Sequence, residues 1–241
     1  MDEAATLALF AQGKEAWNDW ATATAARHRA LVAAGRWCYT VENRYPGETI
    51  PGNPETAAWM SDSIANFGHH EFADEADFSG FVFPGVALFV LNKFAKGARF
   101  TGARFHHGGC FNGASFGGSA EFSDVTFGGY GEFMRASFAA DANFRGARFI
   151  PGEVEPDMAG FAWFGSAKFA ANAVFDAVCF AGNTLFDETQ FAQDASFAGA
   201  QFRGYHYFMG ARFLAAARFT GARFAEGPDF ADASFARPPE W

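Results

Sequence analysis

The sequence lacks three features that would each have indicated a broad class of protein. No apolar run approaches the ~18 residues needed to cross a bilayer, so we expect no association with membranes. No block of basic residues is present and the formal net charge is -9, so we expect no direct binding of nucleic acid. The acidic start, MDEAATLALFAQGKEAW, has neither the basic region nor the cleavage site of a signal peptide.

Cysteine and the larger aromatic residues are also scarce. Cys38, Cys110 and Cys179 are odd in number, which argues against a disulfide framework and favours reduced thiols in a cytoplasm. The chain has only six Trp and five Tyr but 33 Phe, so phenylalanine is expected to supply most of the apolar side chains of the core. This composition indicates one packing position copied many times, and it argues against disorder, because disordered segments lack aromatic residues.

The phenylalanines form a lattice whose steps are five and six residues in strict alternation. The lattice occupies positions 67, 72, 78, 83, 89, 94, 100, 105, 111, 116, 122, 127, 133, 138, 144 and 149, then 164, 169, 175, 180, 186, 191, 197, 202, 208, 213, 219, 224, 230 and 235. Only Phe10, Phe81 and Phe161 lie outside it. Such self-similarity is the signature of a repeat architecture.

The lattice is interrupted once. The step from Phe149 to Phe164 covers fifteen positions where a step of six is due, so nine residues are inserted. The prolines, glycines and acids of Ile150–Gly160 predict an exposed loop there. Because the alternation resumes in register, we expect both halves to belong to one continuous stack.

The residue two positions before a lattice Phe is usually Ala, and a polar residue often separates the two. Residues i and i-2 of an extended strand point to the same side, so Phe and Ala should face inward together. The predicted core therefore includes Phe100, Phe105, Phe111, Phe116, Phe138, Phe144, Phe197, Phe219 and Phe224. Residues that tolerate a left-handed backbone recur third in the six-residue steps, at Gly108, Asp141, Asn172, Asn183, Asp194 and Gly227.

An amphipathic helix is the competing interpretation, because the repeat of eleven is close to three helical turns. A Gly or turn residue falls in nearly every linker, however, and each Gly would cost a helix about 1 kcal/mol. Very short strands joined by corners fit better. Such a chain coils on itself, and each coil hydrogen-bonds the next about 4.8 Å along the axis.

The repeats ARFTG, ASFGG, ANFRG, ASFAG and ARFLA resemble those of the pentapeptide-repeat proteins, in which small and polar residues surround a central Leu or Phe. The resemblance covers about residues 65–235. It implies an all-β solenoid over residues 64–241, a right-handed four-sided parallel β-helix with twenty-two residues per coil and an inserted loop near 150–160. The strict alternation of five- and six-residue steps departs from the simplest members of the family, which repeat every five residues. A two-sided coil of eleven residues is the alternative to the four-sided coil.

The segment before the repeats also resembles this family. GKEAWNDW (Gly13–Trp20) is similar to the G-x-x-x-W-N-x-W element that often precedes the repeats in bacterial members. We expect residues 1–63 to form an α-helical cap and connector, with one or two helices in Ala4–Ala34 and the connector over Thr40–Pro54.

The two ends of the stack need cover, because an open end exposes Phe rings and unpaired strand edges. We expect the helices to lie on the first coils, which place apolar residues in outward positions: Val82, Leu88, Val90 and Leu91. At the other end, the prolines of FARPPEW (Phe235–Trp241) should stop strand pairing, and Trp241 could cover the last layer.

Signals of catalysis and metal binding are weak. A zinc site needs three or four converging ligands, and no second His/Cys cluster lies one coil from His107 and Cys110. We therefore expect these two to be exposed corner residues without a metal. A filled β-helix offers no pocket for a nucleophile, base and orienting group, and no phosphate-binding loop is present. We predict no catalytic residues, no metal site, no cofactor and no enzymatic activity.

Large aromatic side chains in mainly outward positions are the candidate partner-binding residues: Tyr130, Tyr205, His206 and Tyr207. Glu153–Asp157 in the insertion is a second candidate, because loops often carry function. The competing interpretations are tyrosines that pack over one another and a tolerated solvated bulge. We predict a non-enzymatic interaction scaffold with an unidentified protein partner, and self-association as a homodimer is compatible with the sequence.

The resemblance also implies an alternative function. Some pentapeptide-repeat proteins resemble duplex DNA in shape and charge and bind type II topoisomerases, which protects those enzymes from quinolones. Electrostatic mimicry needs a sustained field of one sign, and outward arginines interrupt it here: Arg99, Arg104, Arg148, Arg212, Arg218 and Arg223. Ice binding would need a flat face rich in Thr, which Thr101, Thr126 and Thr220 do not form.

Overall fold

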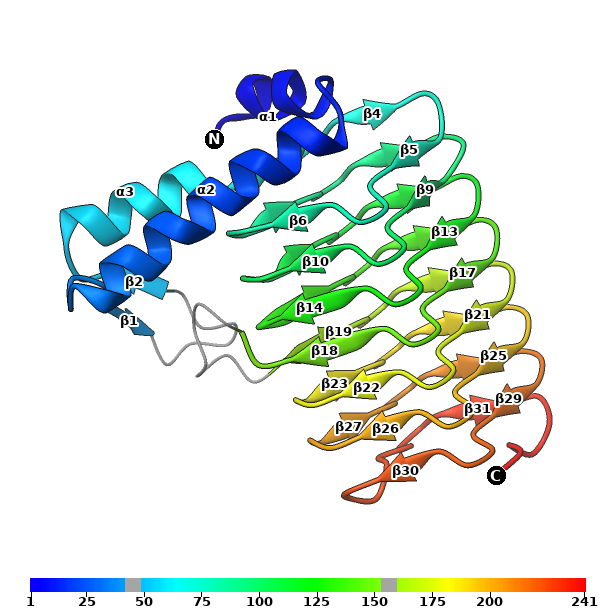
Figure 1. Ribbon diagram of the computed structural model, residues 1–241. Coiled ribbons are helices and arrows are strands. Elements are labelled where there is room, and N and C mark those ends of the chain that lie inside the picture. Colours follow the sequence, from blue (N-terminus) through cyan, green and yellow to red (C-terminus); the bar gives the residue numbers. More distant parts are fainter. Residues whose placement is uncertain (42–48, 153–159) are drawn as a thin grey trace.

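The phenylalanine lattice folds into a rod of stacked coils with helices at one end (Figure 1). The computed structural model describes residues 1–41, 49–152 and 160–241. Each strand is only two or three residues long, because the chain turns a corner after almost every lattice Phe. Four parallel sheets result, one on each side of the rod, and we number them in chain order.

Sheets 1 and 3 are built from strands that end just before a lattice Phe. Sheet 1 contains β3 (Ala65–Asn66), β7 (Ala87–Leu88), β11 (Gly109–Cys110), β15 (Tyr130–Glu132), β19 (Phe161–Trp163), β23 (Thr184–Leu185) and β27 (His206–Tyr207). Sheet 3 contains β5 (Ala76–Asp77), β9 (Ala98–Arg99), β13 (Ala120–Glu121), β17 (Ala142–Asn143), β21 (Ala173–Val174), β25 (Ala195–Ser196) and β29 (Ala217–Arg218).

Sheets 2 and 4 are built from strands that include the lattice Phe. Sheet 2 contains β4 (Glu71–Phe72), β8 (Lys93–Phe94), β12 (Ser115–Phe116), β16 (Ser137–Phe138), β20 (Lys168–Phe169), β24 (Gln190–Phe191), β28 (Arg212–Phe213) and β31 (Ser234–Phe235). Sheet 4 contains β6 (Val82–Phe83), β10 (Arg104–Phe105), β14 (Thr126–Gly128), β18 (Arg148–Ile150), β22 (Cys179–Phe180), β26 (Gln201–Phe202) and β30 (Arg223–Phe224).

The pairing register confirms the four-sided coil and excludes the two-sided one. Phe105 pairs with Phe127, so one coil advances the chain by twenty-two positions. Across the insertion the advance grows to thirty-one, as in the pairing of Phe149 with Phe180, and the difference is the nine inserted residues. Most of the predicted loop, residues 153–159 including the candidate Glu153–Asp157, lies outside the described residues.

The rings form a continuous core in which each Phe makes two kinds of contact. Along the axis, Phe111 stacks on Phe133 with centroids 4.8 Å apart and planes 1° from parallel. Across the coil, the edge of Phe111 meets the face of Phe122 at 5.3 Å and 89°. Each such pair contributes about 0.5–1.5 kcal/mol beyond the burial of area. All lattice Phe are buried except Phe72, Phe224, Phe230 and Phe235, which belong to the first and last coils.

The predicted core is therefore confirmed with one correction. Phe100, Phe105, Phe111, Phe116, Phe138, Phe144, Phe197 and Phe219 are buried. Phe224 is only half-buried, because β30, which contains it, lies at the end of sheet 4. Its ring stacks on Phe202 on one side alone, with a centroid distance of 4.6 Å.

The left-handed corners lie elsewhere than the sequence suggested. Of the six predicted positions only Gly108 has a positive φ. The left-handed residue comes two positions after the first Phe of each five-residue step, at Gly80, Gly102, Gly113, Gly146, Gly199, Gly210 and Gly221 and at the non-glycines His69, Leu91, Asp124, Arg135, Ser166, Ala177, Glu188 and Asp232.

The Asp and Asn residues of the six-residue steps serve another purpose. The side chains of Asp141, Asn183 and Asp194 each accept a hydrogen bond from the backbone of the next coil. Asp194 Oδ1 accepts from the Ala216 amide at 3.2 Å, and Asn183 Oδ1 from the Tyr205 amide at 3.1 Å. These contacts pair corner N–H groups, which would be costly to leave unsatisfied if buried.

The cap consists of α1 (Glu3–Phe10), α2 (Lys14–Ala33) and α3 (Pro54–Ser63), with an antiparallel pair of β1 (Tyr39–Val41) and β2 (Thr49–Pro51). The predicted connector thus contains two short strands, and α3 was not predicted. Its start is nevertheless marked in the sequence, because Asn53 caps the helix by accepting from the Thr56 amide at 2.8 Å and Pro54 opens it.

Residues of the GKEAWNDW segment attach this cap to the first coil. Trp17 is fully buried over Phe67, and its Nε1 donates to the Val82 carbonyl at 2.9 Å. Asn18 donates to the Gly80 carbonyl and accepts from the Val82 amide, which pairs an open strand edge. The helical cap is confirmed, but the expectation that it covers Leu91 is wrong, since that side chain is 52% exposed.

The last described residues close over the final rings. Trp241 stacks on Phe219 with a centroid distance of 5.1 Å, as predicted. The prolines do not end the pairing, however, because Glu240 forms a parallel bridge with Arg218 beyond them. The Phe219 amide donates to the Glu240 carbonyl at 2.6 Å, so the backbone ladder continues for one more rung.

Candidate functional site

The tyrosines singled out from the sequence lie on sheet 1 or at its edge. Tyr130 begins β15, Tyr207 ends β27, and Tyr205 lies at the corner before it. His206 does not share their surface, so the expectation that it faces outward is wrong. It occupies the inward position two before Phe208, where its ring lies between Phe202 and Phe224 with centroids 5.3 and 5.2 Å away. Burial lowers the pKa of His206, and its Nε2 lies 2.6 Å from the Glu226 carbonyl.

The outward positions of sheet 1 are unusually apolar. Strand pairing places Leu88, Cys110, Glu132, Trp163, Leu185 and Tyr207 in one column. The Trp163 ring stacks on Phe161, with centroids 5.5 Å apart, and on Tyr130, with centroids 6.5 Å apart. The Tyr130 ring fits because Gly108 has no Cβ, which would lie 2.4 Å from the ring.

Four large apolar side chains remain exposed along the edges of this sheet: Leu91 at 52%, Met134 at 40%, Tyr205 at 59% and Met209 at 44%. We define the aromatic face as these four residues together with Tyr130, Trp163, Leu185 and Tyr207. Exposed apolar patches with polar rims mark interaction surfaces in soluble proteins. The sequence reasoning missed Trp163, Leu185 and the two methionines, although their positions follow from the 22-residue register.

A buried carboxyl group interrupts the aromatic face. Glu132 is buried beside Cys110, whose Sγ donates to Glu132 Oε2 at 3.1 Å, and Asn112 Nδ2 donates to the same oxygen at 2.5 Å. Burial raises the pKa of Glu132, and burial followed by the neighbouring carboxyl raises the pKa of Cys110 to about 12. The expectation that His107 and Cys110 are exposed is therefore wrong, because both are buried against the rod.

Glu132→Gln is expected to stabilise the protein at neutral and alkaline pH. A carboxyl whose pKa is higher in the folded state than in the unfolded chain binds more protons when folded, so its contribution to stability falls as pH rises above the unfolded value. Glutamine keeps the acceptor for Asn112 without the charge. Denaturant unfolding at pH 8 should show a gain on the order of 1 kcal/mol, shrinking towards pH 4.

Glu121→Gln, which removes one negative charge from the neighbouring coil, controls for the change in net charge. A loss of stability on Glu132→Gln at pH 8 would show that the ionised carboxylate stabilises the fold.

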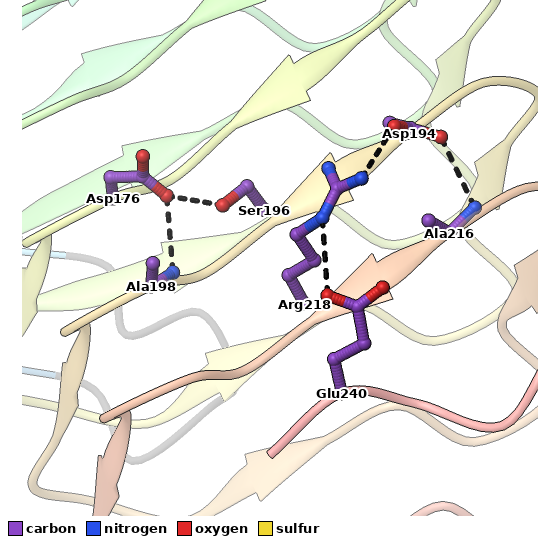
Figure 2. Close-up of polar contacts among 7 residues, drawn as sticks. All are labelled: Asp176, Asp194, Ser196, Ala198, Ala216, Arg218 and Glu240. Carbon is purple, nitrogen blue, oxygen red and sulfur yellow. Dashed lines mark hydrogen bonds and ion pairs between the residues drawn. The ribbon is translucent and has the colours of Figure 1, made fainter.

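Several acidic side chains lie on or beside sheet 3, where they are engaged within the rod. Figure 2 shows Arg218 between Asp194 and Glu240, at 3.0 and 3.3 Å, and Asp176 accepting from Ser196 and the Ala198 amide. The hydrogen bond from Ala216, and then Arg218, hold the pKa of Asp194 below its usual range. The shallow groove of about 570 Å³ along this sheet is therefore lined by groups that tie neighbouring coils together.

Sheet 4 has the opposite charge. Arg104, Arg148 and Arg223 are exposed in one outward column, and Arg203 lies beside them. Within the described ranges none of the four forms an ion pair, and the guanidinium of Arg203 donates to Gln201 at 3.0 Å. Because sheet 4 adjoins sheet 1, these arginines border the aromatic face.

Neither a metal-binding cluster nor a membrane-spanning helix is found in the part of the chain that the structure describes. No group of three His, Cys, Asp or Glu residues there could hold a metal ion. None of the helices of residues 1–41, 49–152 and 160–241 is long and apolar enough to cross a membrane.

Comparison with known proteins agrees with the geometry. Residues 197–238 match a family model described as pentapeptide repeats (9 copies). No curated protein and no solved structure matches the chain. The matched segment contains the same alternating steps as the rest of the lattice, and its strands continue the same four sheets. This match supports the resemblance of the chain to the pentapeptide-repeat proteins.

Proposed function

We propose that this protein is a non-enzymatic scaffold that binds a protein partner through the aromatic face. The observation that carries the proposal is the exposure of Leu91, Met134, Tyr205 and Met209 along one side of the rod. These side chains are not part of the core of the rod, which is filled by the lattice Phe. Tyr, Trp and Met are enriched where protein surfaces meet.

The arginines of sheet 4 suggest the chemistry of that partner. Arg203 precedes Tyr205 by two residues, and Arg223 lies on the next coil of the neighbouring sheet. A partner whose apolar side chains cover Tyr205 and Met209 would meet these guanidinium groups at its edge. Acidic residues there would be matched in charge, which favours fast and selective association.

Capture experiments test the proposal directly. Immobilised full-length protein is incubated with lysate of its source cells, and bound proteins are quantified by mass spectrometry. Tyr205→Ala combined with Met209→Ala should lower recovery of a specific partner at least tenfold. The matched control combines Arg212→Ala and Leu214→Ala on sheet 2, which removes a charge and an equally exposed apolar group from another side.

Equal recovery by both variants would rule out the aromatic face as the binding surface. Turnover of a substrate by the purified protein in a broad hydrolase or transferase screen would overturn the non-enzymatic part. The topoisomerase alternative gains no support from the charges, because Arg99 and Arg218 form ion pairs with the acids of sheet 3 and interrupt the negative surface.

A further inference from the structure

We propose that the cavity between the cap and the first coils binds a small organic anion, with an aliphatic or aromatic body and one carboxylate or sulfonate head. The cavity lies between α2, α3 and sheet 4 and encloses about 350 Å³, within the roughly 300–1,000 Å³ of small-molecule sites. Its apolar walls include Val32, Trp59 and Pro84, and its polar lining comes from His28, Arg29 and His106.

The walls are held in place without a ligand. Trp59 Nε1 donates to the Thr24 carbonyl at 2.8 Å, which fixes α3 against α2. Arg27 and Asp62 form an ion pair between the same helices at 2.8 Å. A site formed in advance loses little ordering entropy when it binds a small molecule.

His28 supplies the observation that points to a ligand. Its Nε2 is buried and has no hydrogen-bond partner among the described residues, although buried polar atoms are nearly always paired. The ring is held at right angles to Trp37, with centroids 4.5 Å apart, and lies 5.0 Å from Trp59. Burial lowers the pKa of His28, which favours the neutral imidazole, and a rotation of this ring would bring the buried Nε2 to a polar group bound in the cavity.

Arg29 indicates that the ligand carries a negative charge. It is exposed, lines the cavity and forms no ion pair within the described ranges. Among the residues that the structure describes, no acidic side chain lines the cavity, so a cationic head would have no counter-charge there. Guanidinium binds carboxylate and sulfonate-type oxygens through paired N–H donors, while an apolar body can pack on Val32 and Trp59.

Titration calorimetry with octanoate, octanol and octylamine tests this inference on the full-length protein. Octanoate should bind with one saturable site, and octanol and octylamine at least tenfold more weakly. Arg29→Met should weaken octanoate binding at least tenfold. Val32→Trp, which places a bulky ring in the mouth at an exposed helical position, should abolish it. Arg148→Gln, two coils away on sheet 4, is the control and should bind as the wild type does.

Absence of saturable octanoate binding would overturn the inference, and so would binding that Arg29→Met and Val32→Trp both leave unchanged. Equal affinity for octanoate and octylamine would refute the anionic head. The inference is independent of the aromatic face, because Tyr205→Ala should leave octanoate binding unchanged whether or not it alters partner capture.

Discussion

Phe138→Ala is expected to lower the free energy of unfolding by about 3–5 kcal/mol. The Phe138 ring lies between Phe116 and Phe169, with centroids 4.9 and 4.6 Å away and planes within 2° of parallel. Its edge also meets Phe144 at 6.2 Å. Removing the ring leaves a cavity that the neighbouring coils cannot fill, because hydrogen bonds hold those coils at a fixed spacing. Guanidinium unfolding followed by circular dichroism measures the loss.

Arg104→Ala provides the comparison for this variant. Its side chain is exposed on sheet 4 and forms no ion pair within the described ranges, so we expect a change within about 0.5 kcal/mol. A shift for Phe138→Ala as small as that for Arg104→Ala would contradict an interior position for the ring.

Trp17→Ala should be equally destabilising, about 3–5 kcal/mol, and should also cause association of the protein. Trp17 is fully buried, covers Phe67 and Phe83, and donates to the carbonyl of Val82 at the open edge of β6. Its removal leaves both rings and that edge accessible to a second molecule, as in strand-edge aggregation. Size-exclusion chromatography with light scattering detects the larger species.

Val32→Ala on the same helix is the matched control, because that side chain is half exposed beyond the first coil. We expect it to remain in the oligomeric state of the wild type. An unchanged elution profile for Trp17→Ala would show that α1 and α3 cover the end of the rod without it.

The fold was largely predictable because one rule repeats through most of the chain. A lattice of Phe with inward Ala two residues before it determined the coil length, the core and the size of the insertion. The backbone conformation of the corners was harder to predict, because Leu91 and Arg135 adopt the left-handed conformation that favours glycine. At these positions the stacking of whole coils overrides the preference of single residues. Helix α3 was missed because its start, Asn53-Pro54, falls within what the sequence presents as a connector.

The candidate surface was predictable only in part. Tyr205 follows Tyr130 by three whole coils plus the nine inserted residues, so their shared side was already implicit in the numbering. His206 was misplaced because the outward tyrosines on either side of it suggested a common surface, although its own position is the inward one. The cavity lined by His28 could not be predicted, because the angle at which α2 leaves the first coil depends on tertiary contacts such as Trp17 with Val82.

The 22-residue register also determines which changes in chain length this architecture tolerates. Deleting one whole coil would shorten the rod by about 4.8 Å and keep every remaining side chain on its own sheet. Deleting half a coil would preserve the alternation of the lattice but move everything downstream to the opposite side, so that Tyr207 would continue the sheet 3 column of Asp77, Arg99 and Glu121. Homologous rods should therefore vary in length by whole coils wherever one surface is under selection.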